Sequence, residues 1–362
     1  MPPDHTILFT PGPTEVAAPI LAELARPIIG HRGEEMQAVI AGIRPRARRL
    51  FGAPDDHEIF LSGSSATGLW EAAIRNTVAR RLLVLTNGAF SERFHEVALA
   101  CGVEADRLDA PWGRAVDPAA VDARLSEGKY DAVAVVHNET STGVANPMAA
   151  IGDVVARHPG VVFLVDVVSS LAGLPVDVTR DRIDVALASV QKCLALPPGL
   201  ALCSVSPRAM ERSRGRTGKG YYFDFVRLKG FFDKNMPMAT PSVGHIRALA
   251  LQLERIEAEG LDRRFARHRA MGEAARAWAG KRFGLYAAEG CRSDTITCVK
   301  VDAGLDLPAF LKGVKRRGFA PGSGYGAIKG TTFRIGHMGD HTPEVLDRLI
   351  GAMDDTLAEM RR

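Results

Sequence analysis

Short runs of apolar residues recur along the first two thirds of the chain. Six of them occupy residues 58–62, 81–86, 131–137, 161–166, 184–189 and 200–206. Most are apolar nearly throughout rather than alternating with polar residues, which is typical of strands buried on both faces of a sheet. The pattern therefore predicts a sheet that is covered on both sides.

Helix-length segments separate several of these runs, for example residues 68–79 and 147–157. Alternation of strands and helices predicts an α/β fold with a mostly parallel sheet. We assign residues 16–242 to this large domain, and we expect residues 1–15 to form an extended arm.

The pattern changes in the last third of the chain. Residues 243–260 carry an amphipathic helical pattern, which continues to Trp278. Two strand-like runs, residues 294–302 and 331–339, then flank a helical segment near residues 308–317. This mixture predicts a smaller α+β unit.

A last helix is expected to begin at Thr342. Threonine is a favoured N-cap, and the Pro343 that follows it is a favoured first helical residue. We therefore predict that residues 243–362 form a bridging helix and a small C-terminal domain.

Composition narrows the function classes. The chain has 362 residues and a net charge of only +4, which gives no case for nucleic acid or a membrane surface as a partner. No apolar run reaches membrane-spanning length, and no charged-then-apolar leader opens the sequence. The five cysteines are scattered without a CxxC pair, which is typical of reduced thiols, so we expect a cytoplasmic protein.

No metal site is predicted. His337 and His341 are four residues apart, but Gly339 and the cap expected at Thr342 place them in a loop rather than on one helix face.

The candidate chemistry begins with Lys192, the one strong base in the otherwise apolar and small-residue stretch 184–199. Desolvation at the end of a buried strand lowers the pKa of an amine, and a neutral amine can form a Schiff base with a carbonyl. A lysine that extends to the surface would explain the same pattern.

Asp166 ends the apolar run at residues 161–166. A carboxylate in that position needs a cationic partner. In pyridoxal phosphate enzymes the partner is the protonated pyridine nitrogen, which keeps the ring an electron sink. An aspartate that ends a strand and binds no ligand remains the alternative.

Ser65, Ala66 and Thr67 lie between the first apolar run and a helix. Backbone N–H groups at a helix N-terminus, with hydroxyls beside them, bind anions such as phosphate. An ordinary helix cap is the alternative. Together, a phosphate loop, a strand-end aspartate and a lysine follow the order that pyridoxal phosphate enzymes of fold type I require.

With these residues in place, the sequence resembles a known family, the class V aminotransferases, and in particular its alanine/serine–glyoxylate (serine–pyruvate) branch. The resemblance runs nearly end to end through the segments FTPGPTEV, GHR, SATGLWEA, NGAF, HNETSTGV, VDVVSS, QKCLALPPG, MATPSV and FRIGHMG. It implies a large domain with a mostly parallel seven-stranded sheet and a smaller α+β domain. It also implies pyridoxal 5′-phosphate as cofactor, and a homodimer whose active site is shared between subunits.

The resemblance assigns a role to each matching residue. Lys192 would form the Schiff base and carry the proton, and Asp166 would pair with the ring nitrogen. The other cofactor contacts would be Ser65, Ala66, Thr67 and Gln191 at the phosphate, Phe90 and Val168 on the ring faces, Thr140 at the ring hydroxyl, and Thr240 at the phosphate of the neighbouring subunit's cofactor. Without the resemblance, Phe90 would be expected in the core.

Arg334 is the substrate-binding candidate. A planar guanidinium can hold an α-carboxylate by two parallel hydrogen bonds, and an arginine in an apolar strand needs an anion. The alternative is an internal salt bridge to a core carboxylate. The arm around residues 9–14 would close over the site, and Tyr325 would line the same pocket.

We therefore predict a transaminase that moves an amino group from alanine or serine to glyoxylate or pyruvate by a ping-pong mechanism. No second arginine is evident for a side-chain carboxylate, which favours these small donors. Three alternatives remain. They are another class V donor (aspartate, phosphoserine or 2-aminoethylphosphonate, the phosphonate with Arg216 or Lys219 as an extra cation), a lyase that uses Cys291 or Cys298, and a non-catalytic subunit of the same fold.

Overall fold

The computed structural model describes residues 5–361. Its largest layer is a seven-stranded sheet in the order β2-β10-β9-β8-β5-β3-β4. The strands are β2 (Glu58–Ser62), β3 (Arg81–Thr86), β4 (Glu104–Asp109), β5 (Ala132–Val136), β8 (Val162–Asp166), β9 (Val185–Ser189) and β10 (Ala201–Val205). All neighbours are parallel except β10, which runs antiparallel to β2 and to β9. The predicted α/β fold with a mostly parallel sheet is confirmed.

Every residue of β5, β8, β9 and β10 is buried, which explains why these strands are continuous apolar runs. The edge strand β4 was not predicted. Its sequence EADRLD is only partly buried and carries four charges, so it lacks the apolar signal of the central strands.

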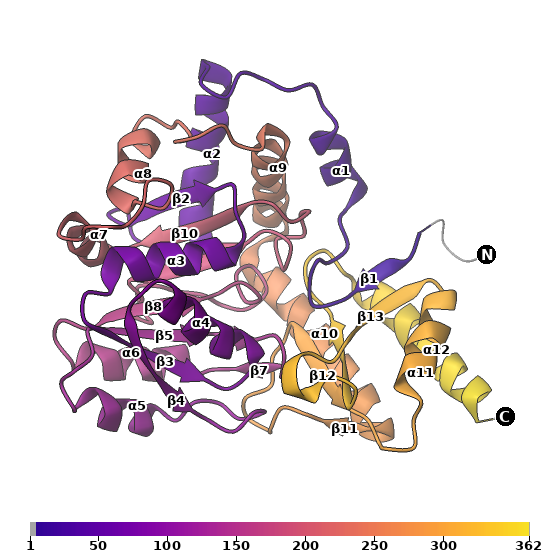
Figure 1. Cartoon of the computed structure of the whole chain (residues 1–362). Helices are drawn as coiled ribbons and strands as arrows, with labels where there is room; N and C mark the ends of the chain where they lie inside the picture. Colours follow the sequence, from indigo (N-terminus) through magenta and orange to yellow (C-terminus); the bar gives the residue numbers. More distant parts are fainter. Residues whose placement is uncertain (1–4, 362) are drawn as a thin grey trace.

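Nine helices belong to the part of the chain that builds this sheet or packs on it. They are α1 (Ala18–Leu24), α2 (Glu34–Leu50), α3 (Ala66–Thr77), α4 (Ala89–Ala100), α5 (Pro118–Leu125), α6 (Met148–Ala156), α7 (Pro207–Arg214), α8 (Phe225–Phe232) and α9 (Val243–Glu259). Helices α3 and α4 pack over the middle strands (Figure 1). A short hairpin, β6 (Asn138–Glu139) and β7 (Val144–Ala145), follows β5.

The C-terminal part contains a second, five-stranded sheet in the order β1-β13-β14-β12-β11. Its elements are β1 (Ile7–Phe9), α10 (Leu261–Arg282), β11 (Gly284–Leu285), β12 (Ile296–Lys300), α11 (Leu307–Arg316), β13 (Phe319–Ser323), the 3-10 turn η1 (Gly326–Ile328), β14 (Thr332–Gly336) and α12 (Pro343–Met360). The sequence predicted only β12 and β14 here. Strand β13 was not predicted, because its sequence FAPGS contains proline and glycine, which are unfavourable in strands.

The N-terminal arm is a structural part of the small sheet. Ile7–Phe9 pair in parallel with residues 319–321 of β13, so this part of the expected extended arm is a β-strand. Residues 1–4 of the predicted arm lie outside the described residues. After β1 the chain runs to α1, which lies beside α9 of the large domain (Figure 1). On the way Thr14 N donates to Gln191 O at 3.2 Å.

A buried arginine ties the two parts together near the future site. Gly260, with φ +83°, separates α9 from α10, and Arg264 lies in the first turns of α10. Its Nη2 donates to Cys193 O at 2.7 Å and to Asp340 Oδ1 at 3.0 Å. The loop after β9 and the loop after β14 are thereby held by one side chain.

In residues 5–361 no helix is both long and apolar enough to cross a membrane. The same residues contain no group of three or more His, Cys, Asp or Glu side chains arranged to hold a metal. His337 and His341 instead hydrogen-bond to the Thr297 hydroxyl and to Leu8 O.

Candidate active site

The carboxyl ends of β5, β8 and β9 meet at one edge of the large sheet. Asp166 is the last residue of β8, and Lys192 follows the last residue of β9 by three positions. Because neighbouring parallel strands end at the same edge, both residues line one cavity of about 370 Å³. The volume lies within the range of small-molecule pockets.

Lys192 is buried, with 8% of its surface exposed. Its Nζ donates a hydrogen bond to Pro11 O, and it takes part in no ion pair among residues 5–361. Desolvation, and then the nearby charge of Arg334, lowers the pKa of its amine to about 8. The alternative explanation, a lysine that extends to the surface, is therefore wrong.

The close approach of the arm to Lys192 depends on Gly12. Its φ is +105°, and a Cβ there would lie 2.7 Å from Lys192 Cε and 2.8 Å from Nζ. Only glycine combines that backbone angle with the missing side chain. Gly12 and Pro13 thus form one wall of the cavity.

Asp166 is a buried carboxyl without a cation. It accepts hydrogen bonds from Trp70 Nε1 and from Val168 N, both at 2.8 Å, and no ion pair among the described residues includes it. Desolvation raises the pKa of its carboxyl to about 7. A cationic ligand placed beside it would remove this penalty, because an opposite charge favours the ionised carboxylate.

The start of α3 lies on the same cavity, which Ser65, Ala66, Thr67 and Gln191 line. Ser65 is the N-cap of α3, but its side chain makes no capping hydrogen bond. The first N–H groups of a helix have no partner within the helix, and the helix dipole favours negative charge there. The four residues predicted to hold a phosphate therefore lie on one wall of the cavity, and their contact with a phosphate stays a prediction.

Phe90 lines the cavity from the first turn of α4. The buried carboxylate of Glu139 accepts from Phe90 N at 3.3 Å and from Ser91 N at 2.9 Å, which fixes the start of the helix. The Phe90 ring stacks on Tyr325, with centroids 5.2 Å apart and planes 7° from parallel. Phe90 is therefore not an ordinary core residue.

Val168 and Thr140 complete the lining predicted from the sequence. Val168 follows Asp166 closely, so its position is set by the end of β8. The Thr140 hydroxyl hydrogen-bonds to the Ser169 hydroxyl at 2.9 Å, and Ser169 Oγ donates to Asn138 O at 2.7 Å. A polar cluster thus orients Thr140.

Arg334, on β14, is buried with 8% of its surface exposed. Neither Arg334 nor Tyr325, which was expected to line the same pocket, is among the residues that line the cavity. Its Nε donates to Ser323 O at 2.9 Å and its Nη1 to Thr140 O at 3.2 Å. No ion pair among residues 5–361 includes it, so the internal salt bridge offered as the alternative is absent. Desolvation lowers the pKa of its guanidinium, and such a buried cation calls for an anion from outside the chain.

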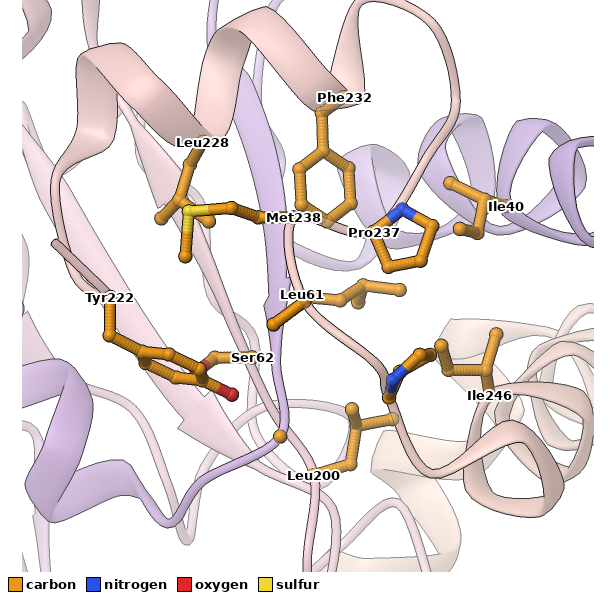
Figure 2. Close-up of a pocket in the computed structure, with 13 residues that line it drawn as sticks. Ile40, Leu61, Ser62, Leu200, Tyr222, Leu228, Phe232, Pro237, Met238 and Ile246 are labelled. Atoms are coloured by element: carbon orange, nitrogen blue, oxygen red, sulfur yellow. The ribbon is translucent and has the colours of Figure 1, made fainter. Parts of the chain in front are cut away.

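Thr240 is the one predicted cofactor residue that the structure leaves apart. It is exposed and does not line the cavity. The segment around it covers a second, largely apolar cavity, which Pro237 and Met238 face together with Leu61 and Phe232 (Figure 2). That cavity holds about 30 Å³, room for about one water molecule, and no charged side chain lines it.

The residues named for the alternative functions also lie outside the cavity lining. Lys219 donates to Asp224 Oδ1 at 2.7 Å, and it is buried by that local contact. Cys298 is buried in β12, where desolvation raises the pKa of its thiol to about 12. Neither Lys219 nor Cys298 therefore offers a reactive group to the site, and Arg216 and Cys291 do not reach it.

Four cavity residues were missed by the sequence analysis: Trp70, Arg93, Val136 and Pro198. Trp70 lies one helical turn after Ala66 on α3, a spacing that places both on one face. Arg93 lies one turn after Phe90 on α4 by the same rule and lines the cavity. The sequence gave no evident second arginine near the site, and the structure places one there.

The family is decided by comparison with known proteins. The family model described as aminotransferase class V matches residues 22–306. The chain belongs to the class V aminotransferases.

Individual class V relatives resemble the chain over most of their length. A serine–glyoxylate aminotransferase of Methylorubrum extorquens is 32% identical over 93% of this chain and 87% of its own. An L-aspartate–glyoxylate aminotransferase of Paracoccus denitrificans is 31% identical over 98% and 91%. The solved alanine–glyoxylate aminotransferase of Nostoc is 25% identical, with a TM-score of 0.93 over 99% of this chain and 96% of its own.

As a class V aminotransferase, the protein is an enzyme that transfers amino groups with pyridoxal 5′-phosphate as cofactor. The cavity fits this group. It offers a buried carboxyl without a cation, an amine of lowered pKa, and the uncapped start of a helix. These three features match, in order, a pyridine nitrogen, an aldehyde and a phosphate.

Proposed function

We propose that this aminotransferase moves the amino group of a small amino acid, alanine or serine, to glyoxylate or pyruvate in a ping-pong cycle. The observation that carries the proposal is the pair of buried, oppositely perturbed groups on one cavity, the Lys192 amine and the Asp166 carboxyl. The serine–glyoxylate and alanine–glyoxylate relatives support these substrates.

In this proposal the cofactor is held at both ends. Asp166 takes the ring nitrogen, and its own position is fixed by Trp70. The phosphate lies at the start of α3 with Ser65, Ala66, Thr67 and Gln191, while the ring lies between Phe90 and Val168 with its hydroxyl toward Thr140. When bound, pyridoxal phosphate supplies the carbonyl that takes up the amino group and the cationic ring that stabilises negative charge on the substrate Cα.

Arg334 binds and orients the substrate carboxylate. Two of its donors are already engaged by backbone carbonyls, so the guanidinium is held in one orientation and its free N–H groups point to one place. A fixed guanidinium positions the Cα–H bond and lowers the entropic cost of reaching the reactive arrangement.

Lys192 moves the proton. Its amine, with a pKa of about 8, is close to neutral at slightly alkaline pH and accepts the proton from the substrate Cα as a general base. In the second half-reaction the same Nζ delivers the proton to the Cα of the new amino acid as a general acid. The arm at Gly12 and Pro13 limits water on this side of the cavity.

We also propose a cytoplasmic homodimer. The exposure of Thr240 outside its own cavity suits a residue that contacts the cofactor phosphate of the partner subunit. All five cysteines are free thiols, which suits a reducing compartment.

The experiment is an absorbance spectrum of the purified protein with pyridoxal phosphate, before and after L-alanine, L-serine, L-aspartate or 2-aminoethylphosphonate. We expect alanine or serine to convert the spectrum of the bound cofactor to that of its amino form, and glyoxylate to restore it. A spectrum that no donor changes would overturn the transaminase proposal. Failure to bind the cofactor at all would overturn the role of Lys192.

A further inference from the structure

One arginine lines the cavity itself, whereas Arg334 is outside the lining and contacts it through Thr140 O. Arg93, on the second turn of α4, lines the cavity together with Lys192. Its Cζ lies 5.3 Å from the centroid of the Phe90 ring and 5.7 Å from that of Tyr325. No ion pair among residues 5–361 includes Arg93, so its charge is not neutralised by the part of the chain that the structure describes.

Tyr325 links the two guanidinium groups. Arg93 Nη2 donates a hydrogen bond to the phenol oxygen of Tyr325, and Arg334 Cζ lies 5.5 Å from the centroid of the same ring. Because the phenol oxygen already accepts from Arg93, the phenol hydrogen remains available as a donor. Within residues 5–361, the remaining N–H groups of Arg93 on the cavity wall and the phenol hydrogen next to them have no acceptor, which is the chemistry of an anion site.

The small-donor reaction leaves Arg93 without a counterion. Alanine, serine, glyoxylate and pyruvate each carry one carboxylate, which Arg334 takes, and the cofactor phosphate lies at the start of α3. A guanidinium on the cavity wall that meets no anion in either half-reaction gains little from its position. A substrate with a second acidic group would give it a partner.

We propose that Arg93 and the Tyr325 hydroxyl form a second anion subsite, which binds the side-chain carboxylate of an acidic amino donor while Arg334 holds the α-carboxylate. Aspartate is the smallest such donor and is the one we assign. The inference rests on the proposed function and adds an acidic donor to the neutral ones. A planar guanidinium suits this task because it can meet both oxygens of a carboxylate.

The test uses the cofactor-loaded enzyme and three variants. Arg93→Gln removes the charge, Tyr325→Phe removes only the hydroxyl, and Glu96→Gln changes an exposed residue on the same helix as the matched control. One measurement is kcat/KM for L-aspartate and for L-alanine with glyoxylate as acceptor. The other is the affinity for succinate and for butyrate by titration calorimetry, because neither acid has an amino group to transfer.

We expect the wild type to use aspartate and to bind succinate more tightly than butyrate. Arg93→Gln should lower the aspartate-to-alanine ratio of kcat/KM roughly 10- to 100-fold, the value of a lost hydrogen bond to a charged group, and should weaken succinate by a similar factor relative to butyrate. Tyr325→Phe should have a smaller effect of the same sign, roughly 5-fold. Glu96→Gln should resemble the wild type.

Equal binding of succinate and butyrate by the wild type would overturn the subsite. An equal loss of both substrates in Arg93→Gln would also overturn it, because that result assigns Arg93 to the positioning of Phe90. If no donor reacts and succinate binding still depends on Arg93, the transaminase proposal fails while the anion subsite stands. The two proposals are therefore separately testable.

Discussion

Replacing Lys192 by methionine should stabilise the cofactor-free protein while abolishing its activity. The lysine is buried, and desolvation lowers the pKa of its amine from 10.5 to about 8. At neutral pH the folded protein therefore holds a protonated amine in surroundings that disfavour it. Methionine has nearly the same length and no charge.

The magnitude follows from the two pKa values. One pKa unit corresponds to about 1.4 kcal/mol, so the drop from 10.5 to about 8 costs the wild type about 3 kcal/mol of stability at pH 7. The variant loses the hydrogen bond from Lys192 to Pro11 O, which lowers its stability by about 1 kcal/mol. We expect a net gain of about 2 kcal/mol for the Lys192→Met variant at pH 7.

The sign of the pH dependence is opposite to that of a stabilising ion pair. Between pH 8 and 10.5 the unfolded lysine binds more protons than the folded one, so the wild type gains stability as the pH rises. The advantage of the methionine variant is therefore complete below pH 8 and disappears by about pH 10.

The assay is urea unfolding of the cofactor-free wild type and variant at pH 7 and pH 10, followed by tryptophan fluorescence. Taking the difference between the two proteins removes the other titrating groups. A variant that is less stable than the wild type at pH 7, or a difference that is the same at both pH values, would refute the burial argument. Loss of cofactor absorbance in the variant checks the catalytic half of the prediction.

Variants of three other residues of the site give four further tests. Arg334→Gln should lower kcat/KM for L-alanine at least about 100-fold in steady-state kinetics, because two charge-assisted hydrogen bonds to the substrate are lost; an unchanged value would exclude Arg334 from substrate binding. Asp166→Asn should weaken pyridoxal phosphate binding about 100-fold or more in a fluorescence titration. The same variant should be more stable without cofactor above pH 7 but not below pH 4, because the folded pKa of Asp166, about 7, lies above its usual 3.8; a gain at pH 4 would contradict this. Gly12→Ala should displace the Lys192 amine and lower kcat more than it raises KM. If the variant had the same kinetics as the wild type, the arm would be able to move away from Lys192 without cost.

The local sequence was sufficient to predict the central strands of the large sheet and three parts of the site. The central strands are buried on both faces and must therefore be apolar, so their own sequence is enough to identify them as strands. The start of α3, Asp166 and Lys192 were found because each ends or begins an element, and the carboxyl ends of parallel strands meet at one edge.

The resemblance to a family supplied what local pattern could not. Phe90, Val168, Thr140 and Gln191 look ordinary by residue type, and all four line the cavity, while their contacts with the cofactor stay predictions. Thr240 marks the limit of a single chain, because its expected contact lies on a partner.

Only the tertiary structure decided how distant segments complete the site. The pairing of β1 with β13 joins residues more than 300 positions apart, and it brings Gly12 against Lys192. Trp70 and Arg93 became visible as cavity residues once their helices were docked on the sheet. The sequence by itself determined which elements form and where the reactive groups stand on them, because those properties depend on neighbours in the chain. Which uncompensated charges share a cavity depends on packing between elements, and only the folded chain sets it.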